Sequence, residues 1–245
     1  STVPGQSAAL TRSFSYDSAA RMRSNSQVGV YGYNSNSPAH APRTVTPAGG
    51  PARTLSYDAN GNMTAGYGGK AMTYDASNRI TQVVQGGITT PYVYGADGSR
   101  LLRIDDAGTA NETETLTFGP VEIRDFGAGT GEIISTMPLP SIRLIHRKSG
   151  GVVTLDHEVL HTDQLGSVRL ITDSTGARVT RRAYAPFGAI LAEATWIATL
   201  PPEDRGWIGE RLDRNAGLQY LNARYYDPDL ALFTSPDWLD VMQAG

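Results

Sequence analysis

Two groups of residues in this sequence combine types and spacing that could support catalysis. The first is an H-E-x-x-H pattern running from His157 to His161, which zinc hydrolases use to bind a metal ion. The pattern needs a helix, on which both imidazoles share one face and the glutamate activates a metal-bound water. Residues typical of strands flank it, and a third ligand would have to be a carboxylate such as Glu193. We interpret the match as a coincidence and predict neither a metal site nor a cofactor.

The second group is a pair of carboxylates, Asp227 and Asp237. Two carboxylates held close together can share a proton, so that one acts as a base and the other as an acid. A structural interpretation fits the same residues: Asp227 caps the turn at Pro228, and Asp237 caps a short helix over residues 238–244. The sequence contains neither a G-x-S-x-G nucleophile motif nor a glycine-rich phosphate loop.

Both aspartates belong to the stretch 209–237, which is predicted to form two strands joined by a turn. Gly217 follows a polar run and can take a positive φ, as a turn requires. The apolar and aromatic residues 218–226 favour a strand. Asp227-Pro228 ends that strand, because proline cannot donate to a ladder and restricts the residue before it.

A tyrosine-aspartate phrase recurs in the N-terminal half of the chain. Each copy has an apolar strand end, the Tyr-Asp pair and a turn, and a looser copy surrounds Tyr94. The three clear copies are Tyr16-Asp17, Tyr57-Asp58 and Tyr74-Asp75. We expect each aspartate to cap its turn, and Asn60-Gly61 and Asp97-Gly98 to form type I′ hairpin turns. The tyrosines either bond neighbouring hairpins, which we favour, or offer rings on which a sugar could stack.

Further along, turn residues and strand residues alternate. Residues 168–172 and 179–184 are predicted to pair as a hairpin around the turn 173–176. The glycines expected to shape turns here are Gly166, Gly176 and Gly188. The stretches 32–51 and 127–140 are predicted to be surface loops, and the alanine-rich residues 189–199 a short helix.

Composition limits the class of protein. The 245 residues carry a net charge of −3 and no cysteine, which argues against nucleic-acid binding, disulfides and thiolate metal sites. No run of 18 apolar residues predicts a membrane span, and the first residues do not resemble a signal peptide. We predict an all-β fold of hairpins in a spiralling sheet, with one or two short helices near the C-terminus. Residues 1–150 would form the repeat region and residues 151–245 a second, core region.

The Tyr-Asp phrases are followed by HTDQLGS, TDSTG, YAPFG and GLQYLNARYYDPDLALFTSPD. Together these phrases resemble the RHS/YD-repeat family and its repeat-associated core domain, most strongly over residues 161–237. The resemblance implies a hollow β-sheet shell that holds a C-terminal toxic polypeptide, in a bacterial protein that is secreted or at the cell surface. Its implied partners are that cargo, the remainder of the shell and a secretion-apparatus protein, with no nucleic acid.

The resemblance also implies chemistry. Many family members cleave themselves by an aspartyl mechanism, which would involve Asp227 and Asp237 with Arg224 as the nearby basic residue. The family's cleavage segment lies beyond Gly245, so we expect no enzymatic activity from this chain alone. Ala231 and Leu232 stand where the family usually has a turn glycine and an arginine.

Two alternatives to a toxin shell remain. The first is a cell-surface adhesion or carbohydrate-binding module built from the same repeats. The second, weaker alternative is a zinc-dependent hydrolase at His157 and His161. Because a piece of a spiral exposes unpaired edge strands, we also expect the isolated chain to aggregate or dimerise through them.

Overall fold

The computed structural model describes residues 11–34, 41–125, 133–139, 141–149, 151–197 and 202–237. Within these residues the regular structure is almost entirely β strand, which confirms the predicted all-β class. The two helical elements are single 3₁₀ turns, η1 (Tyr67–Gly69) and η2 (Trp207–Gly209). No helix in the described part of the chain is long and apolar enough to cross a membrane.

The strands form three antiparallel sheets in which each strand pairs with its neighbours in sequence. The five-stranded sheet contains β1 (Phe14–Tyr16), β2 (Met22–Asn25), β3 (Gly29–Gly32), β4 (Thr44–Thr46) and β5 (Arg53–Thr54). The fourteen-stranded sheet contains β6 (Ser56–Tyr57), β7 (Met63–Ala65), β8 (Ala71–Tyr74), β9 (Ile80–Gln85), β10 (Ile88–Tyr94), β11 (Arg100–Asp105), β12 (Thr113–Phe118), β13 (Val121–Asp125), β14 (Ile133–Leu139), β15 (Ile142–Ser149), β16 (Val152–Thr162), β17 (Val168–Asp173), β18 (Arg178–Tyr184) and β19 (Ile190–Thr195). The four-stranded sheet contains β20 (Arg211–Asp213), β21 (Leu218–Tyr220), β22 (Tyr225–Asp227) and β23 (Leu232–Phe233).

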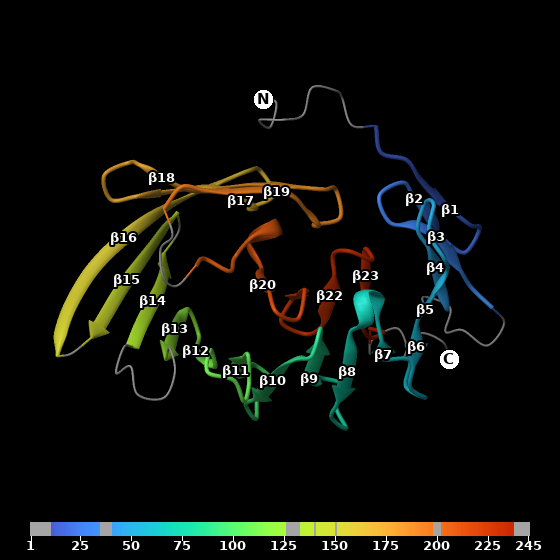
Figure 1. Ribbon diagram of the computed structural model, residues 1–245, viewed down its shortest axis with the longest axis horizontal. Coiled ribbons are helices and arrows are strands. Elements are labelled where there is room, and N and C mark those ends of the chain that lie inside the picture. Colours follow the sequence, from blue (N-terminus) through green and yellow to red (C-terminus); the bar gives the residue numbers. More distant parts are fainter. Residues whose placement is uncertain are drawn as a thin grey trace.

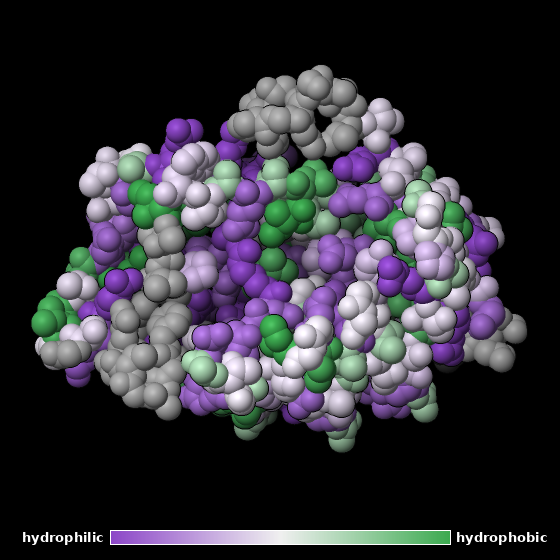
Figure 2. All heavy atoms as spheres, in the orientation of Figure 1, coloured by the Kyte–Doolittle hydropathy of each residue, from purple (hydrophilic) through white to green (hydrophobic). Residues whose placement is uncertain are grey.

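The two larger sheets form a curved wall, and the small sheet lies inside it. In Figure 1, β1–β19 follow the rim of the molecule, while β20, β22 and β23 lie in the middle. Figure 2 shows the same face hollowed between the upper and lower strands, with many hydrophilic residues around the hollow. We call residues 202–237, which include the four-stranded sheet, the inner segment.

Several turns of the wall share one geometry that the sequence phrases encode. The aspartate at the end of a strand accepts two backbone N–H groups, from the residues two and four positions later. Asp58 Oδ1 accepts from Asn60 at 2.9 Å and Asn62 at 2.8 Å. The same pattern occurs at Asp17, Asp75, Asp163 and Asp173.

The residue three positions after each capping aspartate takes a positive φ. Gly61, Gly166 and Gly176 occupy this position with φ values of 86°, 82° and 85°. Asn60 and Asp97 have no positive φ, so the predicted type I′ turns are wrong. The strand register shifts beside the turn at Tyr57 instead, which is the bulge that a single left-handed residue produces.

The predicted helix over residues 189–199 is wrong, because Ile190–Thr195 forms the edge strand β19. Its pairing with β18 overrides the weak helix preference of alanine. The predicted loops 32–51 and 127–140 likewise contain β4 and β14. The predicted hairpin is confirmed by β17 and β18. The predicted helix 238–244 lies outside the described residues.

The predicted strand 218–226 is interrupted. Residues Leu218–Tyr220 and Tyr225–Asp227 form separate strands that pair with each other. Asn222, with φ of 60°, lies in the tight turn between them. The interruption folds the aromatic stretch back on itself, so Tyr220 and Tyr225 lie with their ring centroids 5.2 Å apart.

The main hydrophobic core lies between the wall and the inner segment. Leu218 and Leu230 of the inner segment are fully buried among side chains of β2–β10. Each such leucine contributes about 2 kcal/mol through burial. The Tyr31 hydroxyl donates to the Leu230 carbonyl at 2.7 Å. The wall therefore shares its apolar core with a segment about 200 residues further along the chain.

We expect Gly188→Ala to destabilise the fold by about 2 kcal/mol more than Gly176→Ala. Both glycines have a positive φ, 90° and 85°, so an alanine is strained at either position. At Gly188 a Cβ would also lie 2.6 Å from Cε3 of Trp207, whereas at Gly176 it would meet nothing within 4 Å. Urea unfolding of the two variants measures the difference, and equal losses would contradict the proposed contact.

Candidate functional site

Asp227 is fully buried and paired with a cation. Its Oδ2 lies 2.7 Å from Nζ of Lys70, and both side chains are at most 1 % exposed. Its Oδ1 accepts backbone N–H groups of Asp229 and Leu230 at 3.0 and 3.1 Å. Burial raises the pKa of Asp227, although the Lys70 ammonium opposes the rise. Asp227 therefore joins the turn of the inner segment to the loop before β8.

The residues around this ion pair explain two features of the sequence. Gly217 has φ of 59°, and a Cβ there would lie 3.2 Å from Cε of Lys70. Because Gly217 has no side chain, the Lys70 side chain can lie close to the backbone there and reach Asp227. Pro228 lies in the turn that Asp227 caps. Ala231 adopts φ of 56°, so it keeps the left-handed conformation that a turn glycine would take more easily.

Asp237 lies in a different environment from Asp227. It pairs with Arg224 at 3.1 Å, and the two side chains are 35 % and 23 % exposed. The Arg224 guanidinium also lies 3.7 Å from the centroid of the Phe233 ring. The structure therefore gives each predicted aspartate its own cation: a buried lysine for Asp227 and an accessible arginine for Asp237.

A second buried cluster of charges joins the inner segment to the wall. Asp213 is fully buried and accepts from Arg100 of β11 at 2.5 Å and from Arg103 at 2.7 Å. Asp204 accepts from Arg103 at 2.8 Å and from Arg124 of β13 at 2.7 Å. Burial alone would raise the pKa of Asp204, but these two arginines hold it well below the ordinary value.

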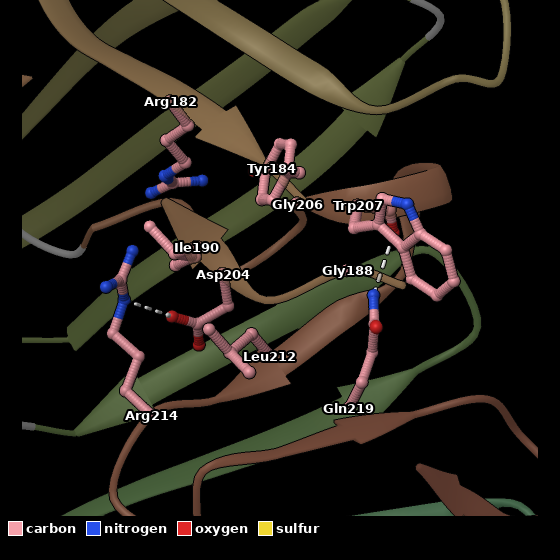
Figure 3. Close-up of a pocket in the computed structure, with 10 residues that line it drawn as sticks. All are labelled: Arg182, Tyr184, Gly188, Ile190, Asp204, Gly206, Trp207, Leu212, Arg214 and Gln219. Atoms are coloured by element: carbon pink, nitrogen blue, oxygen red, sulfur yellow. Dashed lines mark hydrogen bonds and ion pairs between the residues drawn. The ribbon is translucent and has the colours of Figure 1, made fainter. Parts of the chain in front are cut away.

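The cluster continues along the wall towards β18. Arg143 of β15, 2 % exposed, bonds Glu158 at 2.9 Å and lies 3.5 Å from Glu203. Arg182 of β18 donates to the carbonyls of Glu203 and Arg205. Figure 3 shows this end of the cluster, with Arg214 directed at Asp204, 4.0 Å away. The wall supplies most of the arginines and the inner segment supplies most of the acceptors.

The aspartates of this cluster were not singled out from the sequence. A partial signal existed, because β11, β13, β15 and β18 each place an arginine among residues that otherwise suit a buried strand. An arginine inside a strand is also compatible with a solvated sheet face. Only the three-dimensional structure shows that the arginines of β11 and β13 pair with Asp204 and Asp213, 80 to 113 positions away.

We expect the chain to lose stability as the pH falls from about 5 to 3. Burial would raise the pKa of Glu122, but Arg124 and Arg211 lower it from 4.5 to about 2. A carboxyl with a depressed folded-state pKa stabilises the fold above its unfolded-state pKa, and this contribution disappears as the pH falls towards the folded-state value. For Glu122 alone the full loss is about 3 kcal/mol.

The raised pKa of Asp227 acts in the opposite direction, because its folded form binds a proton first. Asp204 and the capping aspartates Asp17, Asp75, Asp163 and Asp173 add to the loss, since their pKa values are lowered. The urea concentration at the midpoint of unfolding, measured at pH values from 7 down to 3, tests the expected net loss of stability. A midpoint that stays constant or rises as the pH falls would contradict the prediction.

The H-E-x-x-H residues lie on strand β16, as the sequence interpretation required. Residues four apart on a strand are about 13 Å apart, so His157 and His161 cannot bind one ion. Glu158 is buried on the Arg143 ion pair, and His161 lies 3.2 Å from the Thr172 hydroxyl. The described residues contain no group of three or more metal-ligating side chains.

The repeat tyrosines bond neighbouring strands. The hydroxyls of Tyr57, Tyr74 and Tyr94 donate to backbone carbonyls 15, 11 and 14 residues earlier. Their rings pack against the main core. Tyr16, on the outermost strand β1, is 53 % exposed. Rings and hydroxyls engaged in this way fit a structural role better than a surface for stacking sugars.

The comparisons with known proteins agree with this architecture. The family model described as Teneurin YD-shell matches residues 157–244. The Double-stranded DNA deaminase toxin A of Burkholderia cenocepacia (strain H111) is 25% identical over 212 residues, covering 75% of this chain and 15% of that protein. The tRNA nuclease WapA of Bacillus subtilis (strain 168) is 28% identical over 192 residues, covering 75% and 7%. The chain therefore spans only a small part of these relatives.

Solved toxin structures share the fold. The crystal structure of TcdB2-TccC3 superposes with a TM-score of 0.69 at 18% identity, covering 93% of this chain and 14% of the other. The Photorhabdus luminescens Tc holotoxin pore gives a TM-score of 0.67 at 18% identity, covering 92% and 14%.

The curved antiparallel wall and its anchored inner segment define a β-sheet shell. Its repeated Tyr-Asp turns and the family match make the assignment more specific. Residues 157–244 match a YD-shell domain of the RHS/YD-repeat family, and the chain is similar to bacterial toxins over 75% of its length.

Proposed function

We propose that this chain is part of the shell of an RHS-type toxin, and that the shell encloses and delivers a toxic polypeptide. The observation that carries the proposal is the anchored inner segment. Asp204, Asp213 and Asp227 are each buried and paired with cations of the wall. These contacts fix the segment within the curve of the wall, as the closed end of a container requires.

The relatives support the same proposal. The matched proteins are named for different activities, deamination of double-stranded DNA and cleavage of tRNA, yet each aligns with 75% of this chain. A region shared by toxins of different activity suits a common scaffold better than a common active site. The enclosed polypeptide and the rest of the shell are then the partners, with a secretion-apparatus protein assisting export to the cell surface or beyond.

Limited proteolysis of the full-length protein that carries this chain tests enclosure. The polypeptide that follows the shell is expected to resist a protease that degrades the same polypeptide expressed alone. The shell variant Asp213→Asn, which loosens the inner segment, is expected to make the enclosed polypeptide sensitive to the protease again. A C-terminal polypeptide that is degraded equally fast in both contexts would count against enclosure.

We further propose that Asp237, rather than Asp227, supplies the carboxylate for self-cleavage in the full-length protein. Asp237 is accessible and pairs with Arg224, whereas Asp227 is buried on Lys70. The chemistry needs a carboxylate that can reach a peptide bond. On this proposal Asp237→Asn leaves the full-length protein uncleaved on a denaturing gel, and a variant that still cleaves at the parent rate would exclude Asp237.

A further inference from the structure

A cleft of about 520 Å³ lies between the wall and the inner segment. Leu139, Leu160, Val168 and Pro120 of the wall provide its apolar lining, and Glu210 of the inner segment also lines it. Leu160 and Val168 are nearly fully buried, so they form its floor. The other carboxylates discussed above do not line the cleft, and its size suits a short stretch of extended polypeptide.

Glu210 is the one acidic side chain in the lining of this cleft, which also contains Arg205 and Arg211. Within the described residues its carboxylate has no hydrogen bond or ion pair, and it is about half-buried. The two arginines have their own acidic partners outside the lining: Arg205 pairs with Glu203 at 3.4 Å, and Arg211 pairs with Glu122. Burial raises the pKa of Glu210, with only partial compensation by Arg211. A partly desolvated carboxylate with no hydrogen bond or ion pair of its own favours a cation from outside the chain.

The loop that carries Glu210 is held in a strained conformation. Ile208 has φ of 51°, which is unfavourable for a β-branched residue and costs about 1 to 3 kcal/mol. The wall enforces it: the Ser167 hydroxyl accepts from the Ile208 N–H at 3.0 Å, and the Gly206 carbonyl accepts from the Val168 N–H at 2.9 Å. Such strain concentrates where a protein binds ligands.

We propose that this cleft binds an extended polypeptide segment in which a lysine or arginine is flanked by apolar side chains. The cation pairs with Glu210, and the apolar neighbours rest on Leu160, Val168 and Leu139. If the proposed enclosure is correct, that segment belongs to the enclosed polypeptide. The cleft then retains its cargo at a defined point by charge complementarity.

Fluorescence anisotropy with the 245-residue chain, at a concentration at which light scattering shows a monomer, tests the cleft itself. The probes are two fluorescein-labelled peptides, one alternating leucine with lysine and the other alternating leucine with glutamate. The leucine-lysine peptide is expected to bind at least about tenfold tighter. Glu210→Gln is expected to remove most of this difference without lowering the melting temperature, because the carboxylate has no partner to lose. Glu114→Gln, on the exposed face of β12 and outside the cleft, is the matched control.

A photo-crosslinking residue at the exposed Thr162, which lines the cleft, tests the natural occupant in the full-length protein. The expected crosslink, mapped by mass spectrometry, joins Thr162 to a lysine- or arginine-containing segment of the C-terminal polypeptide. Equal binding of both peptides, or unchanged binding by Glu210→Gln, would overturn the cleft proposal. Preferential peptide binding combined with a protease-sensitive C-terminal polypeptide would uphold the cleft and reject enclosure.

Discussion

Asp213→Asn is expected to lower the free energy of unfolding by about 3 to 5 kcal/mol. Asp213 is the fully buried acceptor of both Arg100 and Arg103. Asparagine has nearly the same shape, so the change removes the charge and leaves two guanidinium groups buried without it. Burial penalises these cations strongly, and Asp213 is one of the groups that keep their pKa values raised. Urea unfolding at pH 7 measures the loss.

Arg21→Gln is the matched control for this experiment. It breaks the 2.8 Å ion pair between Arg21 and Asp17, in which the arginine side chain is 32 % exposed and the aspartate side chain 21 %. Exposed pairs contribute at most about 1 kcal/mol, so this variant should remain close to the parent. If the two variants lose similar amounts, the buried cluster is not the main link between the wall and the inner segment.

The wall was largely predictable because its information is local. Each Tyr-Asp phrase specifies a strand end, a capping side chain and a left-handed residue within a few positions, as Asp58 and Gly61 show. The same logic at Asp163 and Asp173 extends the repeat turns beyond the Tyr-Asp phrases, although the sequence there looks different. Local rules failed at residues 189–199, where pairing with β18 decides the structure.

The contacts of the site were less predictable because they join distant residues. The sequence marks Asp227 as a carboxylate beside a proline, a description that suits a cap, a catalytic group or an ion pair. Its partner Lys70 lies 157 residues earlier in the chain, in a loop with no distinguishing motif. The folded wall alone brings the two together, and it leaves Asp237 with Arg224 at the accessible end of the inner segment.

The roles of the two aspartates can be separated by a double-mutant cycle on Lys70 and Asp227. Asp227→Asn keeps an oxygen for the turn bonds to Asp229 and Leu230 but leaves the Lys70 ammonium buried without a charge partner. Lys70→Met leaves the Asp227 carboxylate buried without a charge partner. Each single change is expected to cost about 3 to 5 kcal/mol.

The double variant Lys70→Met/Asp227→Asn is expected to lose less than the sum of the single losses, because neither charge then remains buried alone. Below its melting temperature, the full-length Asp227→Asn protein should still cleave itself, since the buried carboxylate has a structural role. Additive losses would contradict the coupling between Lys70 and Asp227. Loss of cleavage in a fully folded Asp227→Asn protein would show instead that Asp227 takes part in the chemistry. In that case the Lys70 ammonium would act by holding a reactive carboxylate in place.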